Sequence, residues 1–290
     1  MSIKKTTHKK LTIGAISILI VLASAVVSTY GLYSYNKVQQ IIQTNSKVKA
    51  ASELAIKAAA AREAKKKEPV YITLPGAKPI KALAEDYSVA SSIWAIVNKT
   101  HPVSIDYIPT NLKIPNVLTR TDKSDSERSI RSDIEQPMIN MFAAASASGN
   151  QLMIGSGYRS AALQAIYFNS LASSVGETVA NQSIAYPGQS EHQTGLAADI
   201  TTVSRNCYLD DCFADTSDGQ WLVNNSYKYG FILRYPKDKE SITEYRYEPW
   251  HFRYVGIDLA TALHDSGLTL DEAWTYLEKA DATLKQNGAI

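Results

Sequence analysis

Hydrophobic and polar positions divide the chain into parts of different character. Residues 11–33 form an uninterrupted stretch of twenty-three uncharged, mostly apolar residues, long enough as a helix rising about 1.5 Å per residue to cross a bilayer. Residues 34–68 are rich in Ala, Lys, Gln and Glu and contain neither Gly nor Pro, which predicts a helical stalk. Pro and Gly return in residues 69–85, so we expect a linker there and a folded domain over residues 86–290.

The pattern within the expected domain mixes helices and strands. Apolar residues at helical spacing predict helices, whereas short apolar runs bounded by Gly or polar residues predict strands. The helices are expected at residues 134–149, 161–175, 219–229 and 270–284, and the strands at residues 152–157, 197–203, 231–235 and 250–255. Because strands and helices do not alternate steadily, the sequence predicts an α+β domain with a mainly antiparallel sheet flanked by helices.

The residues on either side of the apolar stretch predict its orientation. Residues 1–10 carry four Lys and no acidic residue, which favours a cytoplasmic N-terminal tail. Tyr30 and Tyr33 then lie where aromatic side chains collect at the opposite interface. We therefore expect a single-pass transmembrane anchor at residues 11–33, with the rest of the chain outside the cell. The alternative is a secretory signal peptide that is cleaved among the small residues near Ala25.

Charge is distributed unevenly along the chain. The net charge is +2 and residues 1–68 carry +9, which leaves −7 for residues 69–290. A domain with this acidic balance lacks the basic face that neutralises phosphates, so no nucleic acid is expected as a partner. In the stalk, apolar residues form an imperfect stripe, which permits a homodimer through a coiled coil but favours a solvated spacer.

Cys207 and Cys212 are the two cysteines of the chain and lie close together in the segment CYLDDC. An exported domain folds in an oxidising compartment, where a short loop can be closed by a disulfide. The alternatives are a pair of free thiols, or a metal site that would need further ligands at zinc-like spacing, which the neighbouring sequence lacks.

Two short segments, SEHQTGLAAD and EPWH, concentrate residues with metal-binding and acid–base chemistry. His192, Asp199 and His251 supply two imidazoles and one carboxylate, which is the ligand set of a catalytic zinc with one open position. Glu248 precedes His251 by three residues and is the candidate general base. The helical HExxH arrangement of many metalloproteases is absent, so the ligands must come from a loop and from strands.

These segments resemble the VanY-type zinc D-alanyl-D-alanine carboxypeptidases. The likeness extends over roughly residues 90–260 and includes SGYRS at residues 156–160 and GFILRYP at residues 230–236. The resemblance implies that the three ligands named above bind one zinc ion and that Glu248 is the catalytic base. It also implies that Arg159 faces the substrate carboxylate or the developing oxyanion, and that Gln164 and Ser190 help to bind the peptide terminus.

The resemblance implies a zinc carboxypeptidase that removes the C-terminal D-alanine from peptidoglycan stem peptides, with D,D- or L,D-specificity. Such an enzyme would be held at the bacterial cell membrane with its catalytic domain outside. Two alternatives are an endopeptidase for peptidoglycan cross-links and a non-catalytic wall-binding module. The presence of Glu248 beside a full ligand set argues against a binding module, which has no need of a base. The CYLDDC segment does not map onto the family pattern, and we expect it to shape the rim of the site.

Overall fold

The computed structural model describes residues 7–290, which fall into two compact units, one ending at Lys65 and the other running from Lys66 to Ile290. Of the basic tail expected at residues 1–10, residues 1–6 lie outside the described part of the chain. The two units are described separately below.

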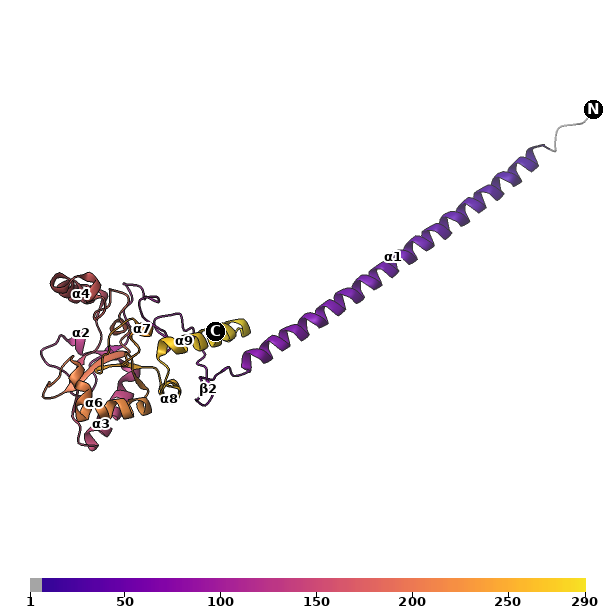
Figure 1. Cartoon of the computed structure of the whole chain (residues 1–290). Helices are drawn as coiled ribbons and strands as arrows, with labels where there is room; N and C mark the ends of the chain where they lie inside the picture. Colours follow the sequence, from indigo (N-terminus) through magenta and orange to yellow (C-terminus); the bar gives the residue numbers. More distant parts are fainter. Residues whose placement is uncertain (1–6) are drawn as a thin grey trace, which may run out of the picture. The chain divides into compact units, whose positions relative to one another are not determined.

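The first unit consists of most of α1 (Thr7–Lys67), a continuous helix that combines the predicted apolar segment and the predicted stalk (Figure 1). Large apolar side chains from Ile18 to Tyr33 are more than half exposed. Within the helix, Ser24 Oγ donates to the carbonyl of Val21 and Thr29 Oγ1 donates to the carbonyl of Ala25, each at 2.8 Å. Among the described residues there is one long apolar helix near the N-terminus, and its apolar window is 0% buried, which is consistent with a single-pass membrane anchor.

The second unit is built on a four-stranded antiparallel sheet in the order β5-β6-β8-β7. Its strands are β5 (Leu152–Ser156), β6 (Ala197–Thr202), β7 (Phe231–Leu233) and β8 (His251–Tyr254). Two small antiparallel ribbons pair β1 (Tyr71–Ile72) with β2 (Ile80–Lys81) and β3 (Leu112–Lys113) with β4 (Ile130–Arg131). The α+β fold with an antiparallel sheet is therefore confirmed.

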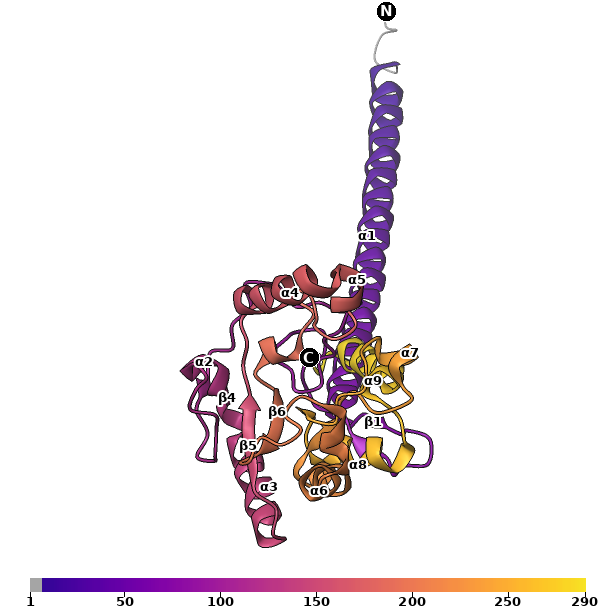
Figure 2. The same ribbon diagram turned by 60° about the vertical axis from the view of Figure 1, so that its left-hand side comes forward.

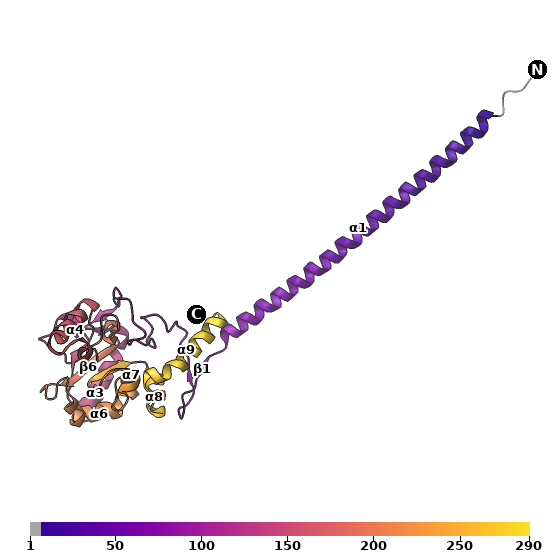
Figure 3. The same ribbon diagram turned by 45° about the horizontal axis from the view of Figure 1, so that its top comes forward.

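Helices surround this sheet. The α-helices are α2 (Asp125–Arg128), α3 (Glu135–Ala147), α4 (Ala161–Val175), α5 (Glu177–Ala180), α6 (Ser217–Asn225), α7 (Glu240–Thr243), α8 (Ile257–Ser266) and α9 (Leu270–Asn287). The 3-10 helices are η1 (Ser132–Ile134), η2 (Glu191–Thr194), η3 (Asp211–Asp215) and η4 (Ser226–Tyr229). Helices α3 and α6 lie together on one side of the strands, and α4 lies on the opposite side (Figures 2 and 3).

Apolar and polar side chains alternate along β6 and β8, which gives the sheet one apolar and one polar face. Ala198 and Ile200 of β6 and Phe252 of β8 join the buried cluster that packs against α3 and α6. Because successive side chains of a strand point to opposite faces, Asp199 and His251 project from the other face of the sheet. The α3–α6 side therefore stabilises the sheet, and the opposite face is free to carry polar chemistry.

Residues 69–85 differ from the expected linker. Ile72, Leu74 and Ala82 are buried in a second core cluster with α8 and α9. Their partners follow about 190 residues later in the sequence, so the local content of Pro and Gly gave no sign of this packing. Both clusters lie entirely within the unit from Lys66 to Ile290, which therefore has a hydrophobic core of its own.

Candidate metal centre

The three predicted metal ligands come together on the polar face of the sheet. His192 Nε2 lies 3.3 Å from Asp199 Oδ2, and His251 Nδ1 lies 3.2 Å from Asp199 Oδ1. One ligand atom from each residue lies within 4.8 Å of the other two, and all three side chains are buried. Asp199 and His251 meet because they are directly paired across β6 and β8.

A left-handed turn brings His192 to the same point. Helix η2 ends at Gly195, whose φ is +69°, a value that side chains with a Cβ rarely adopt. A Cβ at this position would also lie 3.0 Å from Leu112 Cδ2 and 3.1 Å from Arg131 Cγ. The turn leads the chain straight into β6, so that a helical ligand and a strand ligand face each other.

Hydrogen bonding orients both imidazole rings. His192 Nδ1 lies 2.6 Å from the carbonyl oxygen of Gly157 and donates to it, which leaves Nε2 as the free nitrogen facing Asp199. His251 is turned the other way, with Nδ1 toward Asp199 and Nε2 3.6 Å from Glu191 Oε2. Each ring thus presents one nitrogen to the same carboxylate.

The residues present fit a divalent cation. Asp199 Oδ1 is buried and has no hydrogen-bond partner among the described residues, which is costly for a carboxylate oxygen. Burial alone would raise the pKa of Asp199, but His192 and His251 outweigh it and hold that pKa well below its usual range. Burial lowers the pKa of His192, so this imidazole stays neutral. Burial would lower the pKa of His251, but Asp199 and Glu191 outweigh it and raise that pKa to about 9. Zinc requires a deprotonated carboxylate and neutral imidazoles, so its binding would release a proton from His251.

Glu248 lies at the edge of the ligand cluster, with Oε2 3.7 Å from His251 Nδ1. A turn that contains Pro249 places it there, since the amide of His251 donates to the carbonyl of Glu248 at 3.1 Å. Burial raises the pKa of Glu248 to about 7, with His251 opposing this shift and Asp199 adding to it. A carboxyl group with a pKa near neutrality can both accept and return a proton, as a general base must.

Arg159 approaches the cluster from the turn after β5. Its Nη2 lies 3.8 Å from Asp199 Oδ2 and donates to Ser156 Oγ at 3.1 Å, while its Nη1 donates to Gln164 Oε1 at 3.1 Å. Its Nε is buried and has no partner among the described residues. The guanidinium is therefore fixed on one side and has a free donor for an anionic group.

Gln164 and Ser190 contribute differently from each other. Gln164 accepts from Arg159 and donates to the carbonyl of Ala185 at 2.7 Å, so both ends of its amide are used within the protein. It thus positions Arg159. Ser190 lies at the start of η2 and lines the same cavity as the ligands.

The cluster opens into a cavity of about 560 Å³. Binding cavities of small ligands usually measure about 300–1,000 Å³. The wall contains the candidate ligands and Glu248 together with charged and aromatic side chains, among them Arg120, Lys123, Arg159, Tyr167, Tyr208, Tyr235, Tyr245, Arg246 and Trp250. Peptide-sized substrates therefore have room beside the ligand cluster.

Glu191 is a site residue that the sequence did not single out. Its Oε1 accepts from Arg234 Nε at 2.7 Å and from Arg253 Nη1 at 2.9 Å, and Arg234 also pairs with Asp271 of α9. Glu191 and both arginines are closed to solvent. The sequence signal was an Arg in each of two apolar strands, which is rare unless an acid pairs with it.

Parts of this chain are similar in sequence to known proteins. A family model described as VanY, D-alanyl-D-alanine carboxypeptidase, matches residues 127–257. The chain is 46% identical over 188 residues to YodJ of Bacillus subtilis (strain 168), covering 65% of this chain and 68% of YodJ. It is 34% identical over 190 residues to a D-alanyl-D-alanine carboxypeptidase of Enterococcus faecalis (strain ATCC 700802 / V583), covering 62% of this chain and 65% of that protein. It thus spans about two thirds of each relative's length.

Two solved structures are similar as well. The LD-carboxypeptidase LdcB superimposes with a TM-score of 0.61 at 45% identity, covering 66% of this chain and 87% of that chain. A vancomycin-resistance D,D-pentapeptidase VanY in complex with Zn(II) superimposes with a TM-score of 0.52 at 32% identity, covering 65% of this chain and 99% of that chain. Sequence motifs, fold and relatives agree, and this chain belongs to the VanY family of D-alanyl-D-alanine carboxypeptidases.

Proposed function

We propose that this protein is a zinc carboxypeptidase that removes the C-terminal D-alanine from peptidoglycan stem peptides outside the cell membrane. The observation that carries the proposal is the sharing of Asp199 by His192 and His251, with Glu248 only 3.7 Å from the metal-facing nitrogen of His251. One zinc ion would be held by His192 Nε2, an Asp199 oxygen and His251 Nδ1. When bound, it supplies a Lewis acid for the scissile carbonyl.

The chain itself supplies proton transfer and charge stabilisation. Glu248 takes a proton from the attacking water and then delivers a proton to the leaving amine, a double role that suits a pKa near 7. Arg159 lines the cavity, and its guanidinium would face the terminal carboxylate of the substrate or the oxyanion that forms at the carbonyl. Gln164 and Ser156 hold the guanidinium in place for this task.

The comparisons support both specificities within the family. LdcB is an LD-carboxypeptidase, and a second similar structure holds VanYB with D-alanine-D-alanine. The identity to LdcB is 45% and to VanYB 32%. This difference favours cleavage of tetrapeptide stems, the L,D-activity, over cleavage of pentapeptide stems.

The location proposed for the enzyme follows from α1. Residues 11–33 would anchor the chain, with the N-terminus in the cytoplasm and the catalytic unit outside. A disulfide in the catalytic unit suits an oxidising compartment. Residues 34–67 would then act as a spacer, and light scattering of the full chain in detergent tests for a homodimer through this stalk.

The experiment uses the full-length chain in detergent with defined tetrapeptide and pentapeptide muropeptides, and reads the products by mass. Loss of one D-alanine is expected, abolished by a chelator, restored by zinc, and absent in Glu248→Gln. Glu272→Gln, which alters a partly exposed ion pair with Lys239, is the control and should retain activity. Cleavage of cross-linked dimers instead would make the enzyme an endopeptidase. Peptide binding without any change of mass would make it a binding module.

A further inference from the structure

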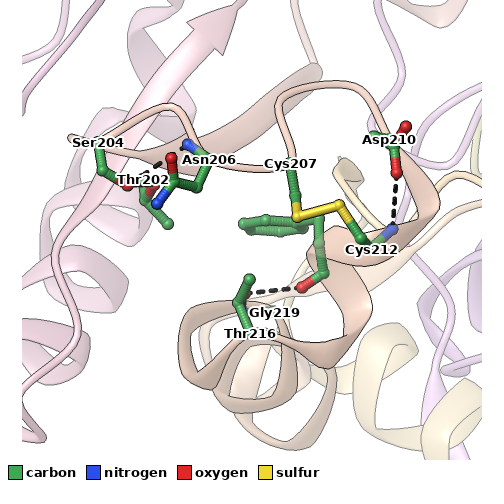
Figure 4. The surroundings of a disulfide bond; sticks show 9 residues. Thr202, Ser204, Asn206, Cys207, Asp210, Cys212, Thr216 and Gly219 are labelled. Carbon is green, nitrogen blue, oxygen red and sulfur yellow. Dashed lines mark hydrogen bonds between the residues drawn. A yellow bond between two sulfur atoms is a disulfide. The ribbon is translucent and has the colours of Figure 1, made fainter.

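The segment between β6 and η3 forms a compact loop that a disulfide between Cys207 and Cys212 closes (Figure 4). Tyr208 and Leu209 of this loop line the active-site cavity. Asp210 Oδ1 accepts from the amide of Cys212 at 2.9 Å, and the Ser204 and Thr202 hydroxyls lie 2.8 Å apart at the other end. These contacts fix the loop at both of its ends.

The loop backbone adopts an unfavourable conformation that needs such support. Arg205, Cys207 and Leu209 have φ values of 58°, 58° and 53°, in the left-handed region that residues with a Cβ rarely occupy. Each such residue costs on the order of 1 kcal/mol or more. The disulfide closes the backbone between Cys207 and Cys212, so Cys207 and Leu209 lie within the ring that it forms.

This conformation places Tyr208 against the sheet. A Cβ on Gly155 of β5 would lie only 2.7 Å from Tyr208 Cε2, so the ring occupies the space that any larger residue would fill. The φ of Gly155 is outside the left-handed region, which means that glycine is needed there for room. On the ring, the Arg120 guanidinium lies 4.6 Å from the centroid, and Asp122 holds Arg120 in turn.

The clamped ring is part of the cavity wall that contains the candidate ligands. Tyr208 and Leu209 line the same cavity as His192, Asp199 and Glu248. A substrate peptide in this cavity would therefore come within reach of the Tyr208 ring.

We propose that Tyr208 is a substrate-binding residue and that the Cys207–Cys212 disulfide holds it in its binding position. The proposal rests on the proposed function, because the ligand is the stem peptide of that reaction. The ring would pack against the peptide, and opening of the disulfide would release the loop and weaken substrate binding without loss of the metal site.

The test measures kcat and KM of the full-length chain in detergent on the tetrapeptide. Tyr208→Ala should lower kcat/KM about ten- to hundredfold, mainly through KM, which corresponds to losing the burial of one aromatic side chain. The paired change Cys207→Ser with Cys212→Ser should act in the same direction. The disulfide is removed by mutation to serine and not by a dithiol reductant, because dithiols also bind zinc.

Two further variants separate this role from a loss of folding. Gly155→Ala should raise KM, because its Cβ would displace the ring while the disulfide stays intact. Tyr208→Ala combined with the two serines should be no worse than Tyr208→Ala alone, since the disulfide acts through Tyr208. Zinc content should equal that of the unaltered chain in every variant.

Calorimetric titration of the tetrapeptide into Glu248→Gln, with and without Tyr208→Ala, detects the contact without turnover. If the unaltered chain releases no D-alanine but Tyr208→Ala still weakens peptide binding, the proposed reaction fails and the Tyr208 contact stands. If Tyr208→Ala leaves both KM and peptide affinity unchanged, Tyr208 is no substrate-binding residue. Independent, additive losses from the serines and from Tyr208→Ala would overturn the role given to the disulfide.

Discussion

Replacing Glu191 by Gln removes one negative charge from an ion cluster that is closed to solvent. Glu191 accepts hydrogen bonds from Arg234 at 2.7 Å and from Arg253 at 2.9 Å, and all three side chains are 0% exposed. Asp271 remains as a charged partner for Arg234, whereas Arg253 would keep uncharged acceptors, among them the backbone carbonyls of Ile93 and Ala95 and the amide oxygen of the new Gln.

The magnitude follows from breaking a buried ion pair on one side. Removing one partner costs about 3–5 kcal/mol, because the remaining charge is left buried without compensation. For a domain of this size, about 1 kcal/mol lowers the melting temperature by about 2–4 °C, so a decrease of about 6–20 °C is expected. The pair between Lys239 and Glu272 is partly exposed, and Glu272→Gln should cost less than about 1 kcal/mol.

The assay is urea unfolding of the unit from Lys66 to Ile290, followed by tryptophan fluorescence in the presence of a chelator, so that metal binding adds nothing to stability. Glu191→Gln should also weaken zinc binding about ten- to hundredfold, because Glu191 Oε2 faces the outer nitrogen of His251. If the unfolding free energy of Glu191→Gln lies within about 1 kcal/mol of that of the unaltered unit, the argument is refuted. The charge of Glu191 would then not be needed to compensate the buried arginines.

Three further predictions concern the turn, the base and acid stability. Gly195→Ala should cost about 1–2 kcal/mol from its left-handed backbone alone and should weaken zinc binding, as chelator competition would report; unchanged affinity would contradict the role of the turn. The kcat/KM should rise with pH up to about 7, or to a lower pH where the bound cation stabilises ionised Glu248; a flat acid limb would exclude this base. Burial would raise the pKa of Glu127, but Lys123 and neighbouring hydroxyls outweigh it and hold that pKa at about 2, against an ordinary 4.5. Its stabilisation should therefore be present above about pH 4.5 and lost toward pH 2, and Glu127→Gln should flatten that part of a melting-temperature profile.

Local signals predicted some elements closely. Helix α4 has the expected bounds, because Ser160 caps its first turn through its side chain and Gly176 ends it with a positive φ. Helix α8 was not expected, since Gly256 precedes it without a side-chain cap and the segment continues directly from β8. Packing between distant segments, as in the ribbon at residues 69–85, leaves no local trace in the sequence.

The candidate site likewise combines residues that local sequence predicts with contacts that depend on distant segments. The candidate metal ligands lie in two short segments, so their chemistry could be predicted from residue types and spacing. The position of Glu191 between two arginines depends on how β7 and β8 pair, and the use of both ends of the Gln164 amide depends on the Ala185 carbonyl. These contacts arise only when the fold is assembled.

The continuous helix α1 determines where an anchored enzyme can work. Counted from Tyr33 to Lys67, its residues rise about 50 Å at about 1.5 Å each. If residues 11–33 span the bilayer as proposed, this stretch without Gly or Pro would set the reach of the chain between the bilayer and the catalytic unit. Turnover would then be confined to a thin shell of wall material nearest the membrane, and lateral diffusion of the anchor would govern how quickly fresh peptide stems come within reach.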